Sequence, residues 1–304
     1  MKLGINLHNP HPDSLGVLKE FGFKHVRLDF PWDVLEPERD AHNNEQMDYA
    51  VEWAKENDID VLGILAYTPG WANGGNGRNY PPLEEEIRYW QRFVHLTIQR
   101  YHWVKYWEIW NEPNLDQFFH GDVAEYMSKV YVPAKDVIRG HASRQITMNY
   151  SGPYVCGPAL AHLEGANWSR WMRDILGGHP YSDDIAVVTH HNYPEDPNEF
   201  WMRVEKVRKI QAGEGHVEKP LWITEFGRKV GRYISEAEQA EWFRAQLSVF
   251  NGHDEIDRAY IYVEYDDLDP QYAGFGLVGP PPEFRMKPAG EVVKEYLRKQ
   301  GEIK

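Results

Sequence analysis

Two glutamates directly follow runs of apolar and aromatic residues that are typical of buried strands. Glu112 ends the run 106–112, Tyr-Trp-Glu-Ile-Trp-Asn-Glu, and Glu225 ends the run 221–225, Leu-Trp-Ile-Thr-Glu. Two carboxyl groups that meet at a cleft can cleave a glycosidic bond, because one protonates the leaving oxygen while the other attacks the anomeric carbon or activates water. The residue types and their positions therefore favour hydrolysis of glycosidic bonds.

The neighbours of Glu112 favour the role of the acid. Burial beside Ile109 and Trp110 would raise the pKa of Glu112 and keep it protonated near neutral pH. Asn111 can donate an amide hydrogen bond to a sugar hydroxyl. The separation of the Glu112 and Glu225 carboxyl groups decides the stereochemistry, since about 5–5.5 Å gives retention and roughly 6.5–9.5 Å gives inversion. The sequence leaves this distance open.

The elements that must position these residues alternate along the chain. Short runs rich in β-branched and aromatic residues are each followed by Gly, Pro, Asn or Asp, which mark strand ends. Apolar residues at helical spacing lie between several of them. The expected strands are near 2–7, 24–30, 59–66, 105–111, 144–150, 184–191, 219–225 and 257–264, and the clearest helices are 44–57, 84–100, 235–250 and 286–300.

Eight such strands with intervening helices predict an α/β fold, a single (β/α)8 TIM barrel that forms one catalytic domain over 1–304. A doubly wound open sheet is the main alternative, but it usually has fewer strands. Three connections, 67–82, 112–120 and 266–285, are longer than a barrel needs. Because all three follow strands, we expect them to wall a cleft at the C-terminal ends of the strands.

Composition excludes several classes of partner. A formal charge of −14 argues against a nucleic-acid partner and against an anionic membrane surface, since both need a basic face. Aromatic residues make up 14% of the chain, and rings suit the apolar faces of a carbohydrate substrate. The one cysteine, Cys156, allows no intramolecular disulfide. Nothing in the sequence indicates an oligomeric state.

Localisation follows from two further features of the sequence. No run reaches about 18 uninterrupted apolar residues, so no membrane-spanning segment is expected. Residues 2–7 already resemble the first strand, which leaves no room for a signal peptide. We therefore expect a cytoplasmic protein, or a secreted one whose leader has been removed.

The two glutamate motifs together carry a family resemblance. The segment 107–113, Trp-Glu-Ile-Trp-Asn-Glu-Pro, resembles the strand-four motif of clan A glycoside hydrolases, and the segment 223–227, Ile-Thr-Glu-Phe-Gly, resembles their strand-seven motif. Family 39 is the most similar, with its relatives that act on β-xylosides or depolymerise exopolysaccharides, and family 5 is a neighbour. The pattern extends over the whole chain.

The resemblance implies a role for each residue that matches the motifs. It implies a retaining, β-specific O-glycosyl hydrolase in which Glu112 is the acid/base and Glu225 is the nucleophile. Asn111 would contact the hydroxyl beside the anomeric carbon, and Arg27 would support the nucleophile. An arginine near Glu225 would keep that carboxyl group ionised. No metal or organic cofactor is implied.

The end of the sixth expected strand adds two candidates. Relatives in the clan have a His and a Tyr around the nucleophile, which implies His191 and Tyr193. Together with His8 and His11, the pair His190 and His191 could instead bind a metal. Adjacent residues on a strand face opposite sides, so both could not bind one ion without a bulge. His191 lies nearer the end of the strand and is the expected pocket residue.

The other substrate-binding candidates fall at or just beyond expected strand ends, where core packing is the alternative. Relatives often have a strand-eight Trp beneath the bound sugar, and here a tyrosine would replace it, so the sugar cannot be assigned by analogy. The candidates for that position are Tyr262 and Tyr265, and the remaining candidates are Trp32, Tyr67, Trp71, Asn149 and Tyr150. A non-catalytic glycan-binding barrel and a metal-dependent hydrolase remain as alternative functions.

Overall fold

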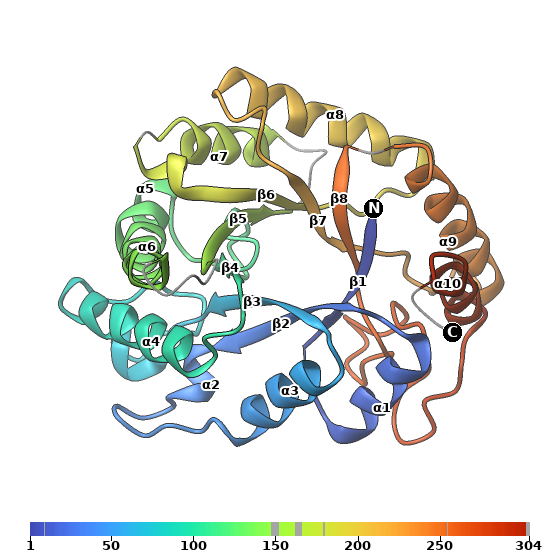
Figure 1. The fold of residues 1–304 in the computed structure, drawn as a ribbon, viewed down its shortest axis with the longest axis horizontal. Coiled ribbons are helices and arrows are strands. Elements are labelled where there is room, and N and C mark those ends of the chain that lie inside the picture. Colours follow the sequence, from blue (N-terminus) through green and yellow to red (C-terminus); the bar gives the residue numbers. More distant parts are fainter. Residues whose placement is uncertain (9, 147–151, 162–165, 179, 254, 302–304) are drawn as a thin grey trace.

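Eight parallel strands form a closed barrel at the centre of the molecule, in the order of the chain (Figure 1). The computed structural model describes residues 1–8, 10–146, 152–161, 166–178, 180–253 and 255–301. The predicted (β/α)8 barrel is confirmed. The strands are β1 (Lys2–Leu7), β2 (His25–Pro31), β3 (Asp60–Ala66), β4 (Tyr106–Ile109), β5 (Tyr154–Leu160), β6 (Ile185–His191), β7 (Leu221–Phe226) and β8 (Ile256–Ile261).

Helices surround the barrel and connect successive strands (Figure 1). All four helices expected from apolar spacing are present. Ser235 begins α9 with a capping box, in which its hydroxyl accepts from the Glu238 N–H and the Glu238 carboxylate accepts from the Ser235 N–H. The α-helices are α1 (Pro12–Phe21), α2 (Trp32–Leu35), α3 (Glu45–Glu56), α4 (Ile87–Arg100), α5 (Val123–Glu125), α6 (Val132–Ile146), α7 (Ala166–Leu176), α8 (Pro197–Gly213), α9 (Glu236–Phe250) and α10 (Pro288–Lys299).

The described residues also include four shorter helical segments. Three are single 3-10 turns and one is a π-helical turn that leads into α6. They are η1 (Gly70–Ala72), η2 (Glu84–Glu86), η3 (Tyr126–Tyr131, the π turn) and η4 (Tyr181–Asp184).

The prediction of the fifth strand at 144–150 is wrong. Residues 144–146 belong to α6, residues 147–151 lie outside the described residues, and the strand is β5 at Tyr154–Leu160. Gly157 and Pro158 are residue types that are depleted in strands, so the sequence of β5 does not look like a strand. The pairing of β5 with β6 shifts register between Pro158 and Leu160, and this irregularity accommodates the proline.

Two hydrophobic clusters form on the two sides of the strands. The larger one packs the outer faces of the strands against the helices. The smaller one contains Cys156 and Trp222. The ring of Trp222 on β7 lies 4.8 Å from that of Tyr106 on β4, two strands that β5 and β6 separate, so these side chains meet in the barrel interior. Burial raises the pKa of the Cys156 thiol well above its usual value, which fits an inert residue.

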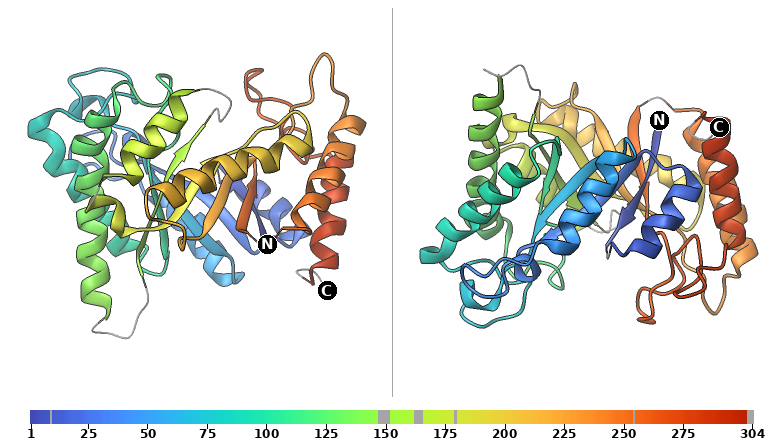
Figure 2. Two further views of the ribbon diagram at one scale, coloured as in Figure 1. Left: turned by 90° about the horizontal axis from the view of Figure 1, so that it is seen from above. Right: turned by 60° about the horizontal axis from the view of Figure 1, so that its bottom comes forward.

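The long connections extend from one end of the barrel. In Figure 2 the cyan connection between β3 and η2 and the orange-red connection between β8 and α10 reach beyond the same strand ends. These are the C-terminal ends of the strands, where the sites of barrel enzymes form. Among the described residues, no helix combines the length and the apolar character needed to cross a membrane.

Candidate active site

A cavity of about 790 Å³ opens at the C-terminal end of the barrel. Glu112, which follows β4, and Glu225, near the end of β7, both line it. The three long connections contribute to its wall, as the sequence predicted. Their lining residues are Tyr67 and Arg78, then Leu115, Gln117 and Phe118, and finally Asp267, Gln271, Tyr272 and Phe275.

Glu112 is held by an unusual turn of the backbone. The φ angles of Trp110 and Glu112 are +74° and +44°, in the left-handed region that side chains other than glycine rarely adopt. The Glu112 N–H donates to the Ala159 carbonyl at 3.2 Å, and the Trp110 indole N–H donates to the Phe118 carbonyl at 2.8 Å. Strained backbone of this kind is typical of functional sites, where surrounding contacts hold it in place.

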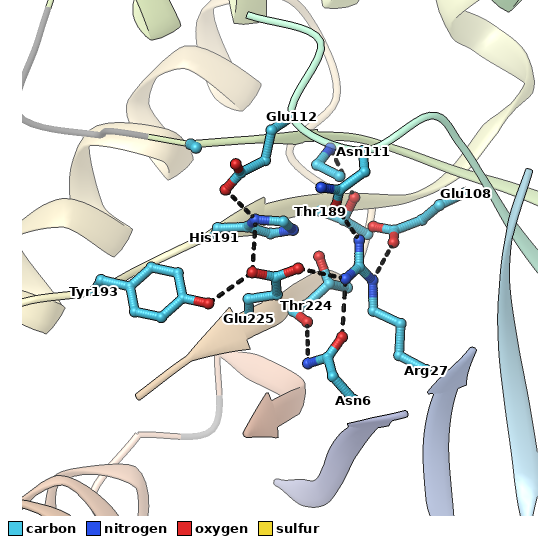
Figure 3. A network of polar contacts seen from close by, with 12 residues as sticks. Asn6, Arg27, Glu108, Asn111, Glu112, Thr189, His191, Tyr193, Thr224 and Glu225 are labelled. Carbon is cyan, nitrogen blue, oxygen red and sulfur yellow. Dashed lines mark hydrogen bonds and ion pairs between the residues drawn. The ribbon is translucent and has the colours of Figure 1, made fainter. Parts of the chain in front are cut away.

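Each oxygen of Glu225 accepts a hydrogen bond from a different side chain (Figure 3). Arg27 Nη1 donates to Oε1 at 2.7 Å, and the Tyr193 hydroxyl donates to Oε2 at 2.6 Å. The Glu225 residue is 5% exposed, and Tyr193 lines the same cavity. These two donors fix the orientation of the carboxylate and stabilise its charge.

His191 lies between the two glutamates (Figure 3). Its Nδ1 is 2.7 Å from Glu112 Oε1 and 3.3 Å from Glu225 Oε2. Burial lowers the pKa of His191 to about 4, and the nearby charge of Glu225 only partly opposes this effect, so the ring is neutral at pH 7. An oxygen of Glu112 and an oxygen of Glu225 lie within 4.8 Å of each other. The two carboxyl groups therefore face each other across His191.

Arg27 on β2 connects the two glutamate strands from below (Figure 3). Its guanidinium donates to Glu108 Oε2 at 2.6 Å, to Asn111 Oδ1 at 2.9 Å and to Asn6 Oδ1 at 2.9 Å, in addition to Glu225. Burial opposes the charge of Arg27, but the carboxylates of Glu108 and Glu225 outweigh it and raise its pKa. Because the Asn111 oxygen is bound by Arg27, the orientation of the amide is set.

His8 and Asp29 form an ion pair in the cavity wall that is not evident from the sequence. His8 Nδ1 lies 2.8 Å from Asp29 Oδ2, and both residues line the cavity. Burial lowers the pKa of His8, but the charge of Asp29 and its hydrogen bond outweigh it and raise the pKa to about 9. Both residues fall at the ends of expected strands, and this position was the available signal. His11 is exposed and is absent from the lining.

The remaining aromatic candidates divide between the cavity and the packed interior. Tyr67 and Tyr262 line the cavity, and the Arg78 guanidinium lies 3.9 Å from the centre of the Tyr67 ring. Trp32, in contrast, is fully buried and packs against Trp71 with 5.3 Å between ring centroids. The expectation that Trp32 binds substrate is wrong, because α2 begins at Trp32 and turns the ring toward α4.

Trp71 and Tyr265 also lie outside the cavity lining. The Trp71 indole N–H donates to the Glu36 carbonyl at 3.0 Å, and the Tyr265 ring packs edge-on against Phe284 at 5.6 Å. These contacts show that both rings pack against neighbouring residues, and their role in substrate binding stays a prediction. Asn149 and Tyr150 lie outside the described residues.

Glu112, His191 and Glu225 could also hold a metal ion, because one ligand atom of each lies within 4.8 Å of the others. These atoms already have other partners, however. Tyr193 and Arg27 donate to the two oxygens of Glu225, and Glu112 lies at hydrogen-bond distance from His191. A cation at this point would displace those hydrogen bonds. His190, the neighbour of His191, is fully buried and is not part of the group, although the pairing of β6 with β7 shifts register between these two residues.

Comparisons with known proteins identify the family and the fold. A family model described as glycosyl hydrolase catalytic core matches residues 89–278. No curated protein sequence matches the chain. Among solved structures, a family 39 glycoside hydrolase from Bacteroides cellulosilyticus WH2 superposes with a TM-score of 0.71 at 19% identity, over 97% of this chain and 63% of that one.

Two further solved structures have the same fold. A family 39 β-xylosidase from Caulobacter crescentus has a TM-score of 0.69 at 21% identity, over 97% of this chain and 70% of that one. Xylanase 10B from Thermotoga maritima has a TM-score of 0.67 at 16% identity, over 98% and 95%. The chain thus spans less than two thirds of the Bacteroides protein but nearly all of the xylanase. Since the model match covers more than half of the chain, the protein belongs to the glycosyl hydrolase catalytic core family.

Proposed function

We propose that the protein is a retaining glycoside hydrolase that cleaves β-linked glycosidic bonds of an oligo- or polysaccharide, with Glu112 as acid/base and Glu225 as nucleophile. The observation that supports this proposal most strongly is the separation of at most 4.8 Å between an oxygen of Glu112 and one of Glu225. A pair of carboxyl groups about 5–5.5 Å apart is typical of retention, since a wider gap is needed for a water molecule in inversion. Membership of the glycosyl hydrolase family supports the reaction class.

In the first step, an oxygen of Glu225 forms a bond to the anomeric carbon while the bond to the leaving oxygen breaks. Glu112 transfers its proton to that leaving oxygen. In the second step, the Glu112 carboxylate takes a proton from water, whose oxygen attacks the anomeric carbon and releases Glu225. Glu112 ends protonated and Glu225 ends as a carboxylate, so the pair is ready for another cycle.

The surrounding residues suit these roles. Arg27 and Tyr193 orient Glu225 for attack, and the neutral ring of His191 separates the two carboxyl groups without adding a charge. Asn111, held by Arg27, is available for the hydroxyl beside the anomeric carbon. We assign a β-linked substrate because similar structures include a β-xylosidase and a xylanase, but the identity of the sugar stays open.

The test is hydrolysis of a panel of β-linked aryl glycosides and polysaccharides by Glu112→Gln and Glu225→Gln. We expect Glu225→Gln to lose at least about 1,000-fold in kcat on every substrate. Glu112→Gln should lose most on substrates with poor leaving groups, because a good leaving group needs little protonation. Glu283→Gln, an exposed change on the β8–α10 connection, is the matched control.

Three outcomes would contradict this assignment in different ways. Full turnover by Glu225→Gln would exclude it as the nucleophile. Binding of glycans by the wild type without any turnover would instead favour a glycan-binding barrel. Loss of activity on exhaustive chelation, restored by a divalent metal, would favour a metal-dependent hydrolase at the Glu112, His191 and Glu225 group.

A further inference from the structure

Two adjacent cations, Arg228 and Lys229, follow β7 after one intervening residue, Gly227, and line the same cavity as Glu225. Both are half-buried. The chain has a formal charge of −14, so two adjacent cations in the wall of a cavity that also contains Asp29 and Asp267 run against its overall composition. Neither residue has a part in the two-carboxylate reaction, which leaves their position to be explained.

The loop that carries these cations is fixed on both sides. A Cβ on Gly227 would lie 2.7 Å from the Tyr262 carbonyl oxygen, so the loop passes close against the segment after β8. The Val230 N–H donates to the Gly274 carbonyl at 2.9 Å. The buried Gln239 amide donates to the carbonyls of Arg228 and Gly274 at 2.7 and 3.0 Å. The backbone that carries the two cations is therefore held in place before any ligand binds.

The charge of Lys229 is not neutralised by an acidic partner. Its ammonium donates to the carbonyls of Pro270 and Gln271 at 3.1 and 2.7 Å, and no carboxylate within the described part of the chain pairs with it. An ammonium has three donors, so one remains for a ligand. These carbonyls hold the ammonium but leave its unit charge in place.

Among the residues that the structure describes, the acidic partner of Arg228 is a weak one. Its Nη1 lies 4.0 Å from Glu195 Oε1, and the Glu195 side chain is 86% exposed. An exposed pair at this distance contributes little and is readily replaced. Arg228 itself is 21% exposed, so its planar fork of donors remains accessible from the cavity.

An aromatic wall connects the cations to the reacting groups. Lys229 Nζ lies 5.8 Å from the centre of the Phe275 ring. Phe275 packs edge-on against Tyr193 at 5.8 Å and against Tyr262 at 5.4 Å, and Tyr193 binds Glu225. A sugar that lies against these rings would bring its substituents within reach of Arg228 and Lys229.

We propose that Arg228 and Lys229 bind an anionic substituent, a carboxylate or a sulfate, on a sugar of the substrate next to the cleaved bond. The substrate class is then an acidic glycan. This inference rests on the proposed function, because the glycan is a substrate only if the protein hydrolyses it. Its test, however, measures binding and needs no hydrolysis. Arg228 offers paired N–H donors that match the two oxygens of a carboxylate, and Lys229 adds a point charge.

The experiment compares matched ligands by calorimetry in a Glu225→Gln background. For the carboxylate, the binding of a glucuronoxylan oligosaccharide is compared with that of the same oligosaccharide after chemical reduction of its carboxyl groups. The sulfate probe is sulfated cello-oligosaccharide against the unsulfated parent. The variants are Arg228→Gln and Lys229→Met. Arg232→Gln, an exposed change on the same connection and outside the cavity lining, is the control.

We expect at least one acidic probe to bind about tenfold or more tightly than its neutral partner. Each of Arg228→Gln and Lys229→Met should reduce that ratio about tenfold, while Arg232→Gln leaves it unchanged. The pair of ligands whose affinity ratio falls in these variants shows whether the site binds a carboxylate or a sulfate. Equal affinity for both members of both pairs, or an equal fall in the ratio with Arg232→Gln, would overturn the inference. Absence of any turnover by the wild type would contradict the proposed function but not the binding of acidic glycans, because the binding measurement needs no turnover.

Discussion

Tyr193 and Arg27 each hold one oxygen of Glu225, and the two contacts have different consequences. The Tyr193 hydroxyl approaches from the cavity, whereas Arg27 approaches from the buried floor. The first contact is accessible to substrate and affects the nucleophile alone. The second also joins Glu108, Asn111 and Asn6 and so supports the barrel itself.

Tyr193→Phe is expected to lower kcat/KM by about 10- to 100-fold. A hydrogen bond to a charged group contributes roughly 1.5–3 kcal/mol, and about 1.4 kcal/mol corresponds to a factor of ten. Steady-state kinetics measure the change. Tyr272→Phe alters another tyrosine of the cavity wall and should stay within about threefold of the wild type. Equal losses for the two variants would contradict a specific contact between Tyr193 and Glu225.

Arg27→Met is expected to destabilise the fold by about 3–5 kcal/mol. The Arg27 and Glu108 side chains are both 0% exposed, so removal of the arginine leaves a buried carboxylate without its partner. Urea unfolding gives the free energy. Lys55→Met breaks the exposed Lys55–Glu52 pair and should cost less than about 1 kcal/mol. A similar small change for Arg27→Met would contradict the structural role of the pair.

Sequence position identified some site residues and missed others for a physical reason. Glu112 and Glu225 each end an apolar run, so their position at the mouth of the barrel follows from strand assignment. The His8–Asp29 pair depends on β1 and β2 lying side by side, which the sequence of each strand does not reveal. Trp32 follows directly after an expected strand, where an aromatic ring can lie in the cavity or in the core. In the folded protein it packs in the core.

At the scale of elements, regular strands were predictable and the irregular one was not. β3 and β7 combine apolar, β-branched residues with clear ends and agree with the prediction to within two residues. β5 contains Gly157 and Pro158 and has its register shifted against β6, so neither propensity nor alternation identifies it. The helices were predictable where apolar spacing and a cap agree, as in α9.

Ser235→Ala is expected to destabilise the protein by about 1 kcal/mol, because the backbone N–H of Glu238, in the first turn of α9, loses its acceptor. The midpoint of urea unfolding should fall while activity stays unchanged, since α9 lies outside the reacting groups. Ser143→Ala, within α6, removes a hydroxyl that only bonds back to the Arg139 carbonyl and should be neutral. Equal effects of the two changes would argue against the capping box.

The free energy of unfolding of the whole molecule depends on pH through two sets of buried groups with opposite effects. On the acid side, burial lowers the pKa of His190 to about 3 and those of His25 and His191 to about 4, from the usual 6.5. Between pH 6.5 and about 4 the unfolded chain binds protons that the folded chain does not, so stability falls as the pH falls. His190→Leu should flatten this limb in thermal melts, whereas the exposed His102→Leu should not.

On the alkaline side, burial raises the pKa of Glu264 to about 8, and Asp29 raises that of His8 to about 9 against the opposing effect of burial. Both groups hold protons in the folded state that the unfolded chain releases. Stability should therefore fall as the pH rises, from 4.5 to 8 for Glu264 and from 6.5 to 9 for His8. Glu264→Gln should flatten the fall above pH 6.5, and an unchanged slope would contradict this assignment.

If Glu225 is the nucleophile, it forms a covalent bond to the sugar during each turnover, and this bond can be trapped. A 2-deoxy-2-fluoro analogue of a cleaved substrate, with a good leaving group, slows the second step and allows the glycosyl-enzyme to accumulate. Mass spectrometry of the digested protein should then find the added sugar on the peptide that contains Glu225. Attachment to another residue would exclude Glu225 as the nucleophile, and turnover that releases the inverted anomer without any covalent adduct would exclude a retaining mechanism.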